Sequence, residues 1–222
     1  MFEAIPVTAF GERIGRCGRD AVPTWNTAEH IVSLRELVSI EAVQPMRRDY
    51  LEALMKHVVL AGDTSAHVYR MSTVQTMRVD PHSVLLGQTF IERGKYQRFL
   101  EGFEAQFAAF CVPRGMAKLG ACIVLGKTAD GKYAIAHYIP PIIELSRERA
   151  ALLDGVHRMY LARQVGTTLE TIAVDRVGAP FPADLHGWDK VAVVTEKPPL
   201  EKRFSNLRRE LFRDLKYVGV DG

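Results

Sequence analysis

Apolar residues recur at helical spacing in the first third of the chain. Thr27–Ile40 carries apolar side chains three and four positions apart, which predicts a helix. Pro45 fits the start of a second helix over Met46–Leu60, which a Gly-containing turn would end. The stretch before them, residues 1–24, is rich in Gly and Arg and is expected to be irregular or weakly extended. We therefore expect residues 1–65 to form a helical N-terminal extension.

The pattern changes near residue 65 from helical spacing to runs that are typical of strands. Ala66–Val79 is rich in β-branched residues and Tyr, and it ends at Asp80-Pro81. Leu119–Leu125 and Tyr133–Ile139 flank Asp130-Gly131, a pair that favours a tight turn. These two runs predict a β-hairpin.

Two further amphipathic stretches favour helices. Lys95–Phe110 places aromatic residues at helical spacing, and we interpret them as core residues. A strand is expected at Lys190–Thr195. Pro198-Pro199 then precedes a leucine-rich stripe over Leu200–Leu215, which predicts a C-terminal docking helix.

A strand, a short helix and a second strand are expected to follow one another in the middle of the C-terminal half. Ala150–Leu153 is a short apolar run, Gly155–Gln164 suits a helix, and Gly166 suits its end. Leu169–Val174 is the next apolar run. This order indicates a βαβ crossover with a parallel strand pair, and hence an α/β protein with a mixed α+β sheet.

Composition sets the broad class of the protein. The chain has 222 residues, is 47% hydrophobic and 25% charged, and carries a formal charge of +3, which permits an anionic ligand. Its three cysteines, Cys17, Cys111 and Cys122, form no CxxC pair and suit reduced thiols. No stretch approaches the roughly 20 apolar residues that a membrane span needs, and the N-terminus lacks the pattern of a signal peptide. We expect a cytoplasmic protein without a membrane partner.

The residues Asp154-Gly155-Val156-His157-Arg158 stand where the buried strand meets the short helix. The amides of a helix start lack intrahelical partners and carry the positive end of the dipole, so they favour an anion. Gly155 would let a ligand approach the backbone, Arg158 would grip phosphate oxygens, and His157 would donate a hydrogen bond or move a proton. The alternative is a capped turn without a ligand, in which the basic pair is solvated or bound to Glu144 or Glu148.

The run Leu152–Arg158, followed by Tyr160 and Ala162, resembles the D-G-x-H-R signature of the ParB/sulfiredoxin-like superfamily. That superfamily includes sulfiredoxin, the ParB nucleotide-binding domain, free-serine kinases and DGQHR-domain proteins. The resemblance is sharp over residues 140–175 and implies that residues 66–222 form a ParB/sulfiredoxin-like nucleotide-binding domain.

The resemblance also implies roles for single residues. Gly155, Val156, His157 and Arg158 would hold the phosphates of ATP or another nucleoside triphosphate. Asp154 would hold Mg²⁺ or substrate, as the acidic position does in kinase-like members. Val156 replaces the catalytic cysteine of sulfiredoxins, which argues against sulfinic acid reductase activity.

The expected function is therefore phosphate binding, with nucleotide hydrolysis or phosphoryl transfer left open. Asp154 and His157 are the catalytic candidates within the motif. Glu144, ten residues before it, is a candidate general base or metal partner. The alternative is a DNA-associated regulatory or partition-like protein without catalysis, which uses nucleotide or DNA phosphate at the same turn.

Overall fold

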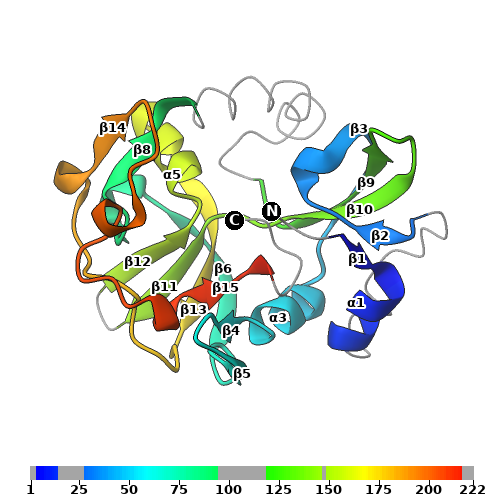
Figure 1. Ribbon diagram of the computed structural model, residues 1–222, viewed down its shortest axis with the longest axis horizontal. Coiled ribbons are helices and arrows are strands. Elements are labelled where there is room, and N and C mark those ends of the chain that lie inside the picture. Colours follow the sequence, from blue (N-terminus) through cyan, green and yellow to red (C-terminus); the bar gives the residue numbers. More distant parts are fainter. Residues whose placement is uncertain (1–3, 15–27, 95–118, 147–148, 217–222) are drawn as a thin grey trace.

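Two β-sheets lie side by side in the computed structural model, which describes residues 4–14, 28–94, 119–146 and 149–216 (Figure 1). Strands outnumber α-helices within these ranges, and each of the two sheets contains both parallel and antiparallel pairs. This content confirms the mixed α+β class expected from the sequence. None of the helices in the described part of the chain is both long enough and apolar enough to cross a membrane.

The first sheet has five strands in the order β1-β2-β10-β9-β3. Their bounds are Ile5–Pro6 for β1, His30–Ile31 for β2, Leu37–Pro45 for β3, Cys122–Thr128 for β9 and Tyr133–Tyr138 for β10. β9 and β10 form the hairpin that the sequence predicts. Gly131 lies in its turn at a φ of 82°, which glycine adopts without strain.

The helix expected over Thr27–Ile40 is wrong. The described part of that range holds β2, a 3-10 helix η1 (Leu34–Glu36) and the start of β3. β3 pairs with β9, and two register irregularities interrupt the alternation of its side chains. The apolar residues at helical spacing, Ile31, Leu34 and Leu37, lie in three different elements, β2, η1 and β3. The first 65 residues therefore supply strands to the sheet that contains β9 and β10, and not helices alone.

The second sheet has five strands in the order β6-β13-β11-β12-β7. Their bounds are Thr73–Val79 for β6, Leu85–Leu86 for β7, Ile142–Ser146 for β11, Arg149–Asp154 for β12 and Leu169–Asp175 for β13. The expected parallel pair of β12 and β13 is wrong, because β11 lies between them. β11 runs antiparallel to β12 and parallel to β13. β12 thus pairs with the strand that immediately precedes it in the chain, as consecutive strands commonly do.

Helix α5 (Val156–Gln164) and several short elements lie outside the two five-stranded sheets. Helix α5 confirms the expected helix, and Gly166 follows it at a φ of 67°. The strand expected at Lys190–Thr195 is confirmed as β14, which pairs with β8. The remaining bounds are Val59–Leu60 for β4, Asp63–His67 for β5, Pro81–Ser83 for η2, Phe90–Glu92 for β8, Trp188–Lys190 for η4 and Ala192–Val194 for β14.

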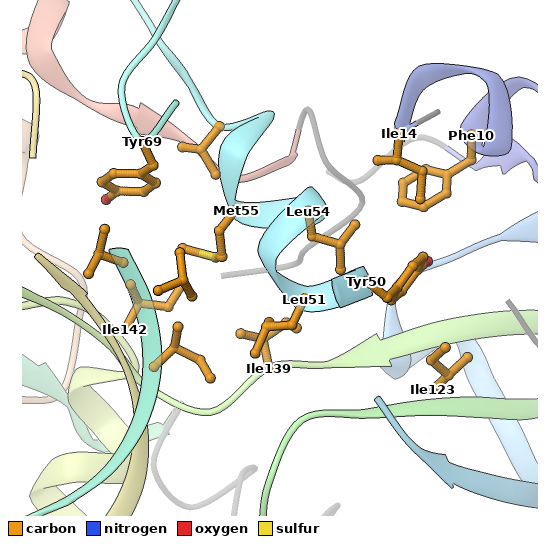
Figure 2. Close-up of a cluster of buried hydrophobic side chains, with 14 of the residues drawn as sticks. Phe10, Ile14, Tyr50, Leu51, Leu54, Met55, Tyr69, Ile123, Ile139 and Ile142 are labelled. Carbon is orange, nitrogen blue, oxygen red and sulfur yellow. The ribbon is translucent and has the colours of Figure 1, made fainter. Parts of the chain in front are cut away.

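Helix α3 (Arg48–Lys56) confirms the helix expected over Met46–Leu60 and packs between the two sheets (Figure 2). Its four buried residues are Tyr50, Leu51, Leu54 and Met55. They belong to one apolar cluster with residues of the first sheet such as Ile123 and of the second sheet such as Ile142. Helix α1 (Val7–Ile14) joins the same cluster, although residues 1–24 were expected to be irregular. The two sheets therefore share one hydrophobic core.

The helix expected over Leu200–Leu215 is also wrong. That range contains two 3-10 helices, η5 (Leu200–Lys202) and η6 (Arg209–Leu211), and the short strand β15 (Arg213–Asp214). β15 pairs with β4 of a three-stranded sheet. Arg213 of β15 is buried, where it forms an ion pair with the buried carboxylate of Glu144. The helix expected at Lys95–Phe110 lies outside the described residues.

Candidate functional site

The Asp154–Arg158 turn forms where the sequence places it, at the junction of β12 and α5. β12 ends at Asp154, Gly155 is the N-cap residue, and the Met159 amide donates to the Gly155 carbonyl at 2.9 Å. Gly155 has a φ of 86°, in the left-handed region. No side chain caps the helix, and its first turn carries no acidic residue. The first-turn amides therefore have no intrahelical acceptor and no capping side chain.

Gly155 packs against the protein itself, so its expected role needs correction. A Cβ atom at this position would lie 2.8 Å from the Cβ of Pro141. The missing side chain therefore admits Pro141 and leaves no open path for a ligand on that side. Gly155 is required here by its positive φ and by this close packing.

Arg158 connects the turn to the segment that joins the two sheets. Its guanidinium donates to the Ile139 carbonyl and, at 3.0 Å, to Asp154 Oδ2. It also lies 5.5 Å above the ring of Tyr138, the last residue of β10. The Arg158 and Asp154 side chains are 16% and 17% exposed. Arg158 thus holds α5 against the end of the first sheet and remains accessible at its edge.

His157 and Val156 have partners from other elements. The backbone amide of Glu92, at the end of β8, donates to His157 Nε2 at 3.2 Å. That contact places the proton of a neutral imidazole on Nδ1. Val156 is half-buried and packs on the apolar cluster beneath α5. His157 is therefore positioned at the start of the helix, whereas Val156 contributes mainly to packing.

Glu144 does not serve the turn as a free base. Its carboxylate is buried and accepts from Arg213 Nε at 2.7 Å and from Arg213 Nη2 at 3.0 Å. The Tyr69 hydroxyl also donates to Glu144 Oε1, at 2.6 Å. Burial, and then the Glu144 charge, raise the pKa of Tyr69, so that hydroxyl stays protonated. Both carboxylate oxygens are occupied, and the expectation of a general base or metal ligand at Glu144 is corrected to a structural role.

Metal binding at the turn would depend on Asp154. Within the described ranges, no group of three or more His, Cys, Asp and Glu side chains is gathered as a metal site. A single carboxylate still fits Mg²⁺, which commonly binds through one or two carboxylates together with substrate phosphates. The Asp154 carboxylate could act as such a ligand if Arg158 released it.

Sequence reasoning missed the residues that surround the turn. Tyr138, Ile139 and Pro141 contact it from the connection between β10 and β11, and Glu92 contacts it from β8. The available signal in this segment is the pair Pro140-Pro141, because consecutive prolines interrupt strands and helices. Nothing in the local pattern showed that this segment meets α5.

Comparisons with protein-family models, curated proteins and solved structures find no match for this chain. The resemblance of residues 152–158 to the ParB/sulfiredoxin-like signature therefore stays a prediction from the motif.

Proposed function

We propose that this chain binds the phosphate groups of a nucleoside triphosphate at the start of α5. The observation that carries the proposal is the uncapped helix start after a half-buried strand end, with Arg158 in the first turn. First-turn amides and the helix dipole favour a negative charge at this position. Arg158 opposes the same dipole, and a bound anion would remove that conflict. The D-G-x-H-R resemblance supports the same ligand class.

Phosphate binding would exchange the partners of Arg158. In the structure the Arg158 guanidinium donates hydrogen bonds to the Asp154 carboxylate and to the Ile139 carbonyl. A guanidinium has five N–H donors and binds phosphate through two parallel hydrogen bonds. A phosphate that replaces Asp154 on Arg158 would leave the Asp154 carboxylate to hold Mg²⁺, which would neutralise charge on the phosphate oxygens.

Transfer or hydrolysis of the γ-phosphate would require a base other than Glu144. His157 lies in the first turn of α5, and its Nε2 atom already accepts a hydrogen bond from the Glu92 amide, so this atom can also accept a proton. A hydroxyl or water that displaced the Glu92 amide from Nε2 would place its proton on His157. We therefore propose His157 as the catalytic base, Arg158 as the phosphate ligand and Asp154 as the metal ligand.

A thermal-shift panel tests this proposal. ATP, GTP, CTP and UTP, each with Mg²⁺, are added to the wild type, to Arg158→Met and to a matched control, Arg149→Met. Arg149 is an exposed arginine at the other end of β12. At a hundred times its Kd a ligand adds roughly 2.7 kcal/mol of stability, or about 5–10 °C for a chain of this size.

At least one nucleotide should raise the melting temperature of the wild type and of Arg149→Met but not of Arg158→Met. An equal shift in Arg158→Met would refute the role of Arg158, and the absence of any shift would refute nucleotide binding. Duplex DNA serves as a competitor for the alternative function. A stabilisation by DNA that falls steeply with salt, without any nucleotide effect, would favour the DNA-associated reading.

A further inference from the structure

A groove of about 610 Å³ lies between the two sheets, beside the first half of α3. Its walls come from the ends of β3 and β6, from α3, from the residues just before β9 and from the start of β13. Small-molecule sites commonly have volumes of about 300–1,000 Å³ and lie where two structural units meet. The groove thus has the size and the location of a metabolite site. It does not include the Asp154–Arg158 turn.

A carboxylate without a partner lines this groove. Glu170 on β13 is half-buried, and its side chain has no hydrogen bond or ion pair in the described part of the chain. Arg78 lies opposite it on β6 and acts on it through space. Burial raises the pKa of Glu170 and outweighs the opposing effect of Arg78. Burial therefore disfavours the charged form by more than Arg78 stabilises it, and a cation in the groove would add the missing stabilisation.

Gly120 shapes the wall against which this carboxylate lies. A Cβ atom at Gly120 would stand 2.5 Å from Glu170 Oε1. Any other residue would therefore push the carboxylate away. The atom it would meet is the end of a flexible side chain, so an alanine here moves Glu170 and leaves the fold intact.

The other charges of the groove compensate each other. Arg48 Nε pairs with Glu52 Oε1 at 2.9 Å within α3. The exposed side chain of Thr76 on β6 lies on the same face of the sheet as Glu170, because the pairs Thr76–Ile172 and Arg78–Glu170 are two residues apart, and it adds an uncharged hydroxyl. Glu170 therefore leaves the lining with a net negative charge, which selects a positively charged ligand.

We propose that the groove binds a small organic cation, a primary amine of metabolite size, whose ammonium group pairs with Glu170. Thr76 receives a polar group of the same ligand, and the apolar residues of the groove cover its carbon skeleton. The site is independent of the phosphate site, since β11 separates the β12 end from β13. Failure of nucleotide binding would leave it unchanged.

Saturation-transfer NMR with matched ligands tests the site. The amines are tryptamine, phenethylamine and 1,4-diaminobutane, and their uncharged counterparts are tryptophol, 2-phenylethanol and 1,4-butanediol. The proteins are the wild type, Glu170→Gln, Gly120→Ala and a control, Glu196→Gln, which changes an exposed glutamate outside the groove. Melting temperatures confirm that each variant is folded.

At least one amine should bind the wild type and Glu196→Gln at least tenfold more tightly than its alcohol counterpart. Glu170→Gln should lose that preference, and Gly120→Ala should weaken the amine at least threefold. The proposal is overturned if no amine binds, if the alcohols bind equally well, or if Glu170→Gln binds the amines as the wild type does.

Discussion

Replacement of Arg213 by methionine removes one partner of a buried ion pair and isolates the other. The Arg213 side chain is 0% exposed and the Glu144 side chain 7%. Arg213 also donates to the carbonyls of Ala179, Pro180 and Leu211. In Arg213→Met the Glu144 carboxylate still accepts a hydrogen bond from the Tyr69 hydroxyl. It stays buried, however, and its negative charge has lost the positive charge of Arg213.

The magnitude follows from that isolation. Breaking a buried pair by removing one partner costs roughly 3–5 kcal/mol. A domain has a total stability of about 5–15 kcal/mol, so this single change removes roughly a fifth of it or more. Glu144→Met in the Arg213→Met background removes the isolated charge. The double variant should recover at least about 2 kcal/mol, because well-packed apolar replacements of buried pairs are often near neutral.

Urea unfolding followed by circular dichroism measures both effects at pH 7, with equal m-values as the condition for comparison. Glu201→Met with Arg209→Met, which removes an exposed pair, is the matched control and should change stability by less than about 1 kcal/mol. If the double variant lost as much stability as the sum of its two single variants, the reasoning from an isolated buried charge would be refuted.

Three further predictions follow from the core, the first sheet and the groove. Leu54→Ala, at a fully buried position of α3, should cost about 2–5 kcal/mol in urea unfolding; a loss below 1 kcal/mol would mean that α3 does not unite the sheets. Gly126→Ala brings a Cβ atom into collision with the Ser39 carbonyl oxygen, so it should lower the melting temperature strongly, whereas Gly94→Ala meets no atom within 4 Å and should not. Glu170→Gln should gain stability over the wild type as the pH rises above 4.5, because burial raises the pKa of Glu170 and its ionisation then opposes folding. Melting curves between pH 4 and 8 test this, and a difference that does not vary with pH would contradict it.

Local chemistry made several elements predictable from the sequence. Asp130-Gly131 fixed the β9–β10 hairpin, because the turn type depends on those residues themselves. Gly155 and Gly166 marked the ends of α5, since each takes a positive φ. The Asp154–Arg158 turn was located for the same reason.

Features that depend on distant partners were not predictable. Spacing alone could not separate a helix from the succession of β2, η1 and β3, because β2 and β3 form through their pairing with β10 and β9. Arg213 falls within the range expected to be a docking helix, although its position depends on the buried Glu144, 69 residues earlier in the chain. Glu144 within the apolar run of β11 was the available signal, because a buried carboxylate requires a cationic or hydrogen-bonding partner.

The candidate site shows the same division between local and distant contacts. Its residues were identified from their order along the chain, but their partners were not. Ile139 and Pro141 belong to the connection between the two sheets, and they contact Arg158 and Gly155 only in the folded chain. The turn therefore also packs against the segment that connects the two sheets, a contact that the motif alone does not indicate.

A crystal structure with Mg²⁺ and a non-hydrolysable ATP analogue tests the central claim most directly. We expect phosphate oxygens within hydrogen-bonding distance of the first-turn amides of α5, with Arg158 turned from Asp154 toward the phosphate. A nucleotide bound elsewhere, with Arg158 still on Asp154 and the Ile139 carbonyl, would contradict the account.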